Sequence, residues 1–183
     1  MARLPNVTRD KVPEEFREAY DEVTGGNVIT GGPGSITIYS PEMARRRAGL
    51  TAYLRYETTF PRRILELAII ATARAMDCPY VWNAHAPAAR SEGVSDALID
   101  ALREKQPLPD IGDDERAVIN YVNEFYANHR ISPETFQAAL DQFGSQHLVE
   151  LTTLMGGYAQ TAFVLNAFEV ELPEGTTEPV LPV

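Results

Sequence analysis

Residues 61–85 of the chain read PRRILELAIIATARAMDCPYVWNAH, and this stretch decides the fold. Its apolar side chains recur at helical spacing, at Ile64, Leu65, Ala68 and Ile69. Such a stripe is typical of a helix that packs on a core. The first helix is expected to end near Asp77, because Pro79 suits the first turn of a new helix and puts Cys78 at its cap. The stretch therefore predicts two helices joined by a short turn.

Turn signals divide the rest of the chain into further helical segments. Helices are predicted from a cap at Thr8 to Gly25, from Pro41 to about Glu57, from Pro79 to Gly93, from Asp96 to about Lys105, from Asp113, from Pro133, and from Ser145 to Val170. Residues 27–40 carry several glycines and are predicted to form a loop. With no convincing strand and no internal repeat, the predicted fold class is all-α.

The length of 183 residues suits one domain. We predict a single domain over residues 1–183, with an N-terminal arm of about residues 1–40 and an extended tail of about residues 171–183. The proline-rich tail and the arm are candidates for reaching across to a neighbouring subunit.

Composition narrows the classes of partner. The formal net charge is −10, so the chain repels phosphate backbones and is not expected to bind nucleic acid. The three arginines at 45–47 are more simply a solvated or intersubunit face. A single cysteine excludes an intrachain disulfide. The apolar run at residues 64–73 is too short to cross a bilayer, and no secretory signal opens the chain. We expect a soluble cytoplasmic protein with no membrane contact.

Three side chains of reactive type gather in the deciding stretch, Glu66, Cys78 and His85. Seven residues make nearly two helical turns, so Cys78 and His85 share a face about 10 Å apart along the axis. Glu66 stands among apolar neighbours and is expected to be buried where the two helices pack. A thiol at a helix N-terminus tends to have a lowered pKa. Together these groups are expected to form a short proton-transfer network.

Each of these residues also has a simpler structural explanation. Cys78 has the character of a small buried hydrophobe, and His85 that of a structural helix residue. Glu66 would then form an ion pair with Arg62, Arg63 or Arg74. Tyr80 and Trp82 are core residues or pocket walls. The sequence holds no HExxH motif, no paired cysteines and no phosphate-binding glycine loop, so neither a metal nor a cofactor is expected.

The same residues resemble the carboxymuconolactone decarboxylase family, which includes the AhpD-type alkylhydroperoxidases. The redox branch of that family carries Glu, eleven residues, Cys-x-x-Cys, three residues and His. Glu66, Cys78 and His85 have this spacing, but Val81 stands where the second cysteine would be. The stretch from Tyr80 to His85 is similar to the branch without paired cysteines. The resemblance implies an all-α, AhpD-like bundle completed by oligomerisation, as a trimer or hexamer, with a dimer as the alternative.

The resemblance also implies a function. We expect a cofactor-independent lyase that uses acid–base catalysis on a small carboxylated or lactone-type substrate. Glu66, His85 and Cys78 would be the catalytic residues, and Tyr80, Trp82 and Arg62 would contact the substrate. One alternative is an AhpD-like alkylhydroperoxidase or peroxiredoxin-type activity through Cys78. Since a dithiol peroxidase needs two thiols, Val81 makes this less favoured. Another alternative is a non-enzymatic oligomeric protein that binds a small ligand.

Overall fold

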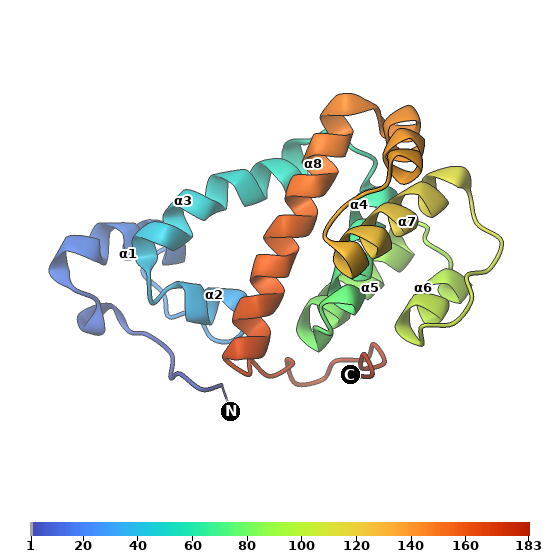
Figure 1. Ribbon diagram of the computed structural model, residues 1–183. Coiled ribbons are helices and arrows are strands. Elements are labelled where there is room, and N and C mark those ends of the chain that lie inside the picture. Colours follow the sequence, from blue (N-terminus) through green and yellow to red (C-terminus); the bar gives the residue numbers. More distant parts are fainter. Residues whose placement is uncertain (1) are drawn as a thin grey trace. The chain divides into compact units, whose positions relative to one another are not determined.

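A computed structural model of the chain describes residues 2–183. Every regular element in this range is a helix, and no strand occurs in it (Figure 1). The predicted all-α fold class is therefore confirmed. The α-helices are α1 (Arg17–Thr24), α2 (Gly32–Thr37), α3 (Pro41–Ala52), α4 (Arg62–Ala75), α5 (Pro79–Ser91), α6 (Asp96–Arg103), α7 (Asp113–Asn128) and α8 (Pro133–Ala167). Short turns η1 (Arg9–Lys11), η2 (Glu14–Phe16) and η3 (Tyr53–Glu57) complete the set.

The chain forms two compact units, and the first contains the described residues up to Thr58 together with residues 163–176. In this unit α3 packs against α1 and α2. A small apolar core in this unit is made of Val7, Val12, Tyr20 and Ile38. The Tyr20 hydroxyl lies 3.1 Å from the carbonyl oxygens of Val7 and Asn27. Through its hydrogen bond to Val7, the buried Tyr20 side chain connects the N-terminal segment to α1.

Two details of the N-terminal segment differ from the sequence prediction. Residues 27–40 are not a continuous loop, because Gly32–Thr37 form the one-and-a-half-turn helix α2. Its first turn contains Pro33, and burial of Ile36 and Ile38 holds the turn against the core. Thr8 does not cap α1 either. It precedes the separate turn η1, and its side chain makes no capping hydrogen bond.

The second unit contains residues 59–162 and 177–183, and α4 is its central element. Every residue of α4 from Ile64 to Arg74 is buried. The helix packs against α5 and α7, and less extensively against α6. A helix that is buried all round lies inside the core rather than on its surface. Any polar group on α4 must therefore find its partner within this unit.

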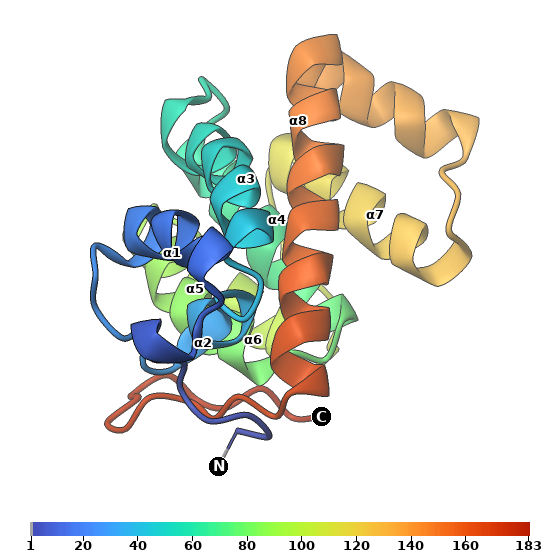
Figure 2. The ribbon, with the colours of Figure 1, turned by 90° about the vertical axis from the view of Figure 1, so that its left-hand side faces the viewer.

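Helix α8 consists of two helices separated by a kink at Gly144, where φ is 74° and ψ is 168°. Figure 2 shows the two parts running in different directions on either side of this point. Backbone angles of this kind are accessible almost only to glycine. The predicted pair of helices, one starting at Pro133 and one at Ser145, is confirmed. Among the described helices, none is both long and apolar enough to cross a bilayer.

Candidate functional site

Residues 61–85 contain α4, the start of α5 and the short connection between these two helices. Asp77 adopts a left-handed conformation with φ at 44°, and the backbone N–H of Cys78 donates to the carbonyl of Ala73 over 2.9 Å. Cys78 is the N-cap of α5, and Pro79 occupies its first turn, as predicted. A three-residue connection brings α5 back alongside α4. Side chains from both helices can therefore meet in the space between them.

Glu66 of α4 and His85 of α5 meet in this space. Nδ1 of His85 lies 2.7 Å from Oε2 of Glu66. Only 1% of the surface of Glu66 and 7% of that of His85 remains exposed. The direction of this hydrogen bond depends on the tautomer of His85, and Nδ1 donates when the carboxylate is ionised, because an ionised carboxylate can only accept. The hydrogen bond is short and shielded from water, which strengthens it.

Two further side chains border this pair. Nη2 of Arg62, one turn before Glu66 on α4, lies 3.4 Å from Oε1 of Glu66. The Tyr158 ring on α8 stands perpendicular to the imidazole of His85, with the ring centres 5.0 Å apart. Such edge-to-face contacts favour one orientation of the rings. The structure thus realises both expectations for Glu66, the contact with His85 and an ion pair with Arg62.

The remaining nitrogen of His85, Nε2, makes no hydrogen bond within residues 2–183. Glu66 holds the opposite side of the imidazole, and Tyr158 limits rotation of the ring. Nε2 is therefore the nitrogen of His85 that the contact with Glu66 leaves unused.

Cys78 lies outside this pair. It is fully buried, and desolvation by burial raises the pKa of its thiol, although backbone N–H groups at Tyr80 and Val81 act in the opposite direction. The expectation of a lowered pKa at the helix N-terminus was wrong. The reason is that loss of hydration disfavours the thiolate more than the helix terminus stabilises it. Val81, at the position of a second cysteine, is also buried.

The two aromatic residues predicted to contact a substrate lie in different environments. Trp82 is fully buried and its indole N–H has no hydrogen-bond partner in the described chain. Tyr80 is half-buried, and burial raises the pKa of its hydroxyl. Of the two, Tyr80 is the residue that a molecule in solution can reach. Trp82 fills the core behind it.

Sequence reasoning assigned no chemical role to Tyr158. Tyr158 lies in the helix predicted from Ser145 to Val170, three residues after Met155 and four before Ala162. The spacing signals that Tyr158 faces the core, but it does not tell which residue of another helix it meets. That information comes only from the packing of α8 on α5.

Among residues 2–183, no three His, Cys, Asp or Glu side chains are grouped so that they could hold a metal ion. A pocket of about 190 Å³ lies in the first unit, between Lys11, Phe16 and Tyr39. Ordinary ligand pockets have volumes of about 300–1,000 Å³. The candidate site is placed at Glu66 and His85 because of their short, buried contact.

The chain was compared with known families, curated proteins and solved structures. Residues 41–124 match the carboxymuconolactone decarboxylase family. No curated protein matches the sequence significantly.

Several solved structures share the fold. One is an uncharacterized peroxidase-related protein from Ralstonia eutropha with an alkylhydroperoxidase AhpD core, which is 13% identical with a TM-score of 0.71, over 94% of this chain and 93% of that one. Another, from Silicibacter sp., is also peroxidase-related, with 14% identity and a TM-score of 0.71, over 96% and 93% of the two chains. A third is a cysteine-to-alanine variant of the debrominase Bmp8 bound to 2,3,4-tribromopyrrole, with 13% identity and a TM-score of 0.71, over 95% of each chain.

At these identities the structural neighbours establish the fold alone, whereas the family match rests on sequence. The matched residues include Glu66, Cys78 and His85, which carried the resemblance. The chain thus matches the carboxymuconolactone decarboxylase family over residues 41–124, and its fold is AhpD-like.

Proposed function

We propose that the chain is a cofactor-independent lyase, resembling carboxymuconolactone decarboxylase, in which Glu66 and His85 perform acid–base catalysis. The observation that supports this function best is the 2.7 Å contact between Nδ1 of His85 and Oε2 of Glu66 in a nearly water-free position. A carboxylate that accepts from Nδ1 fixes the tautomer of a histidine and stabilises its protonated form. The proton on Nε2 is then available to a substrate.

The proposed substrate is a small carboxylate whose CO₂⁻ group lies β to a carbonyl or an enol ether. The carbon–carbon bond to the carboxylate breaks, CO₂ leaves, and the electron pair forms an enolate. Protonated His85 transfers the Nε2 proton to the carbon of the enolate. Neutral His85 then regains a proton from solvent, while Glu66 stays ionised. Groups that stabilise the enolate lower the barrier of the first step.

Arg62 is the proposed contact for a second anionic group of the substrate. Its distance of 3.4 Å from Glu66 exceeds the usual 2.7–2.9 Å of a charge-assisted hydrogen bond, and 39% of its side chain is exposed. A guanidinium carries five N–H donors in a planar arrangement that suits a carboxylate. Tyr80, half-buried on the first turn of α5, would form part of the pocket wall. The debrominase with this fold binds a small planar ring, which supports a substrate of comparable size.

Redox activity through Cys78 is the second candidate, and the peroxidase-related names of two structural neighbours favour it. The surroundings of Cys78 count against it. A reactive cysteine needs access and a stabilised thiolate, but this thiol is buried and its pKa is raised. Non-enzymatic binding of a small ligand is the third candidate, and the ion pair of Glu66 with Arg62 at 3.4 Å favours it, since Glu66 and His85 then only pack the two helices together.

The test is CO₂ release from a panel of small β-keto and enol-lactone carboxylates. Glu66→Gln and His85→Ala are each expected to lower kcat/KM by on the order of 100-fold or more. The matched control is His147→Ala, because His147 is another helical histidine, bonded to Thr59 over 2.9 Å and not to Glu66. Full activity of both site variants would overturn the mechanism.

The expected homo-oligomer, a trimer or hexamer with a dimer as the alternative, and the cytoplasmic location belong to the same proposal. Light scattering of the purified chain measures the subunit count. A monomer that retains full turnover would show that assembly is not needed for the reaction.

A further inference from the structure

Helix α5 contains a proline two positions after His85. Pro87 has no N–H group, so the carbonyl of Asn83 loses its usual donor within the helix. A proline inside a helix bends or weakens the helix at that point. The part of α5 that carries His85 is therefore its least stable part by its own local structure.

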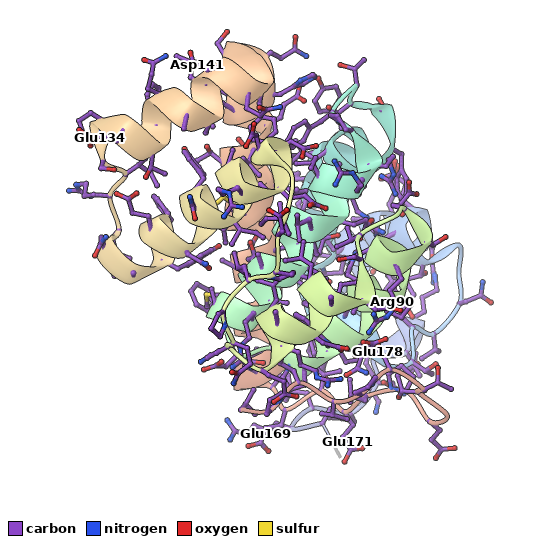
Figure 3. The ribbon with its side chains drawn as sticks, turned by 90° about the vertical axis from the view of Figure 1, so that its right-hand side faces the viewer. Arg90, Glu134, Asp141, Glu169, Glu171 and Glu178 are labelled. Atoms are coloured by element: carbon purple, nitrogen blue, oxygen red, sulfur yellow. The ribbon has the colours of Figure 1, made fainter. Side chains whose placement is uncertain are left out.

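Glu178, in the C-terminal tail, bonds to α5 on both sides of this proline. Nδ2 of Asn83 donates to the main-chain carbonyl of Glu178 over 2.8 Å. Nη2 and Nε of Arg90 donate to the carboxylate of Glu178 over 3.0 and 3.4 Å. Figure 3 shows Arg90 and Glu178 next to each other. One tail residue thus spans the helix from four positions before Pro87 to three positions after it.

The tail around Glu178 is held at other points of the second unit. Leu181 is buried, with 1% of its surface exposed. Nη1 of Arg74, a buried residue near the end of α4, donates to the carbonyl of Pro182 over 2.7 Å. These contacts place Glu178 firmly, so it can in turn restrain the helix that it touches.

We propose that Glu178 is a positioning residue for His85: it acts as a splint across Pro87 and keeps the imidazole against Glu66. Two contacts to one residue hold the two parts of α5 at a set distance from each other. Without them, the helix can open at Pro87, and His85 would leave the carboxylate. Only the consequence for turnover rests on the proposed lyase function, since the restraint on α5 stands apart from it.

Removal of the Glu178 carboxylate should act locally rather than unfold the protein. The reason is that Arg90 keeps another anionic partner, Asp96, at 2.5 Å. The charge of Arg90 is therefore not left uncompensated. Glu178→Gln keeps the main-chain carbonyl that binds Asn83, and it removes the charge and one of the two acceptor oxygens of the contact with Arg90. Asn83→Ala removes the other contact. Glu174→Gln is the matched control, because Glu174 is an exposed tail residue without an ion pair in the described chain.

The experiment is amide hydrogen exchange on the full-length chain. In Glu178→Gln and in Asn83→Ala, amides of residues 84–91 are expected to exchange at least about tenfold faster, while those of α7 keep their rates. Glu174→Gln should match the wild type throughout. Glu178→Asp keeps the charge and should restore part of the protection. Unchanged exchange in α5, or an equal rise across α4, α5 and α7, would overturn the splint.

Turnover supplies the second readout. With faster exchange in α5, kcat of Glu178→Gln is expected to fall several-fold while KM stays close to that of the wild type. Faster exchange with unchanged kcat would show that Glu178 restrains α5 but does not position His85. If no lyase substrate is found, the exchange result still decides whether the splint exists, so the two proposals fail separately.

Discussion

Nδ1 of His85 and Oε2 of Glu66 lie 2.7 Å apart, although 19 positions separate the two residues along the chain. They meet because α5 folds back on α4 after a three-residue turn, with the carboxylate and the imidazole on the facing sides. Burial of an unpaired carboxylate or imidazole would cost free energy, and the hydrogen bond offsets that cost. The pair therefore serves the packing of the two helices as well as any chemistry.

Each member of this pair stabilises the fold through the other. Glu66→Leu leaves Nδ1 of His85 buried without an acceptor, which is expected to lower the free energy of unfolding by about 1–3 kcal/mol. His85→Phe leaves the buried carboxylate without its donor and should cost a similar amount or more. The double variant should lose less than the sum of the two, because it buries no unpaired polar group. Urea denaturation of the four proteins measures this coupling, and strict additivity would contradict it.

The Cys78 thiol is expected to be unreactive in the native protein. Its side chain is fully buried, so a reagent cannot reach the sulfur. Burial also raises the pKa of the thiol, so little of it is ionised to the reactive thiolate. A thiol-specific chromogenic reagent at pH 8 should label the native chain far more slowly than the chain unfolded in guanidinium. Cys78→Ser should show no labelling in either state and provides the blank. Rapid stoichiometric labelling of the native protein would favour the redox alternative.

The raised pKa of Cys78 also predicts how stability depends on pH. In the unfolded chain the thiol loses its proton near the ordinary pKa of 9.0, whereas in the native state it keeps the proton to higher pH. The unfolded state then binds fewer protons than the native state, so stability falls as pH rises above 9. The slope from this one group is at most about 1.4 kcal/mol per pH unit.

Denaturation of the wild type and of Cys78→Ala between pH 8 and pH 10.5 tests this dependence. The difference in the free energy of unfolding between the two proteins should be constant below pH 9 and shrink above it. Tyrosines titrate in the same range in both proteins and cancel in the comparison. A difference that stays constant to pH 10.5 would contradict the raised pKa.

The two parts of α8 offer a test of the kink. Gly144 has φ at 74° and ψ at 168°, so Gly144→Ala is expected to cost about 1–3 kcal/mol of stability. Gly156 has helical angles, and a Cβ there would meet nothing within 4 Å. Gly156→Ala should therefore stabilise the chain by about 0.4–1 kcal/mol. Thermal unfolding of both variants measures whether the melting temperature falls or rises. Equal shifts of the melting temperature in the same direction would argue against this account of the kink.

The local sequence was sufficient to predict helix ends that depend on backbone conformation alone. Proline in the first turn and a preceding cap residue marked the starts of α3, α5 and the first part of α8, and a separate helix from Ser145 was predicted for its second part. The same reasoning missed α2, because its glycines favour a loop and only burial of Ile36 and Ile38 against other segments favours the helix.

At the candidate site, too, some features follow from the sequence and others only from the tertiary structure. The sequence determined that Glu66 stands in an apolar stripe and that His85 lies two turns after a capped helix start, since both follow from helical periodicity. Only the tertiary structure decided that the two side chains meet, that Tyr158 borders the imidazole and that Glu178 spans Pro87. It also decided that the Cys78 thiol is weakly acidic, where its helix position had favoured the opposite. Spacing along a chain specifies which face of a helix a residue occupies, but distances between helices and the loss of hydration depend on how those faces pack.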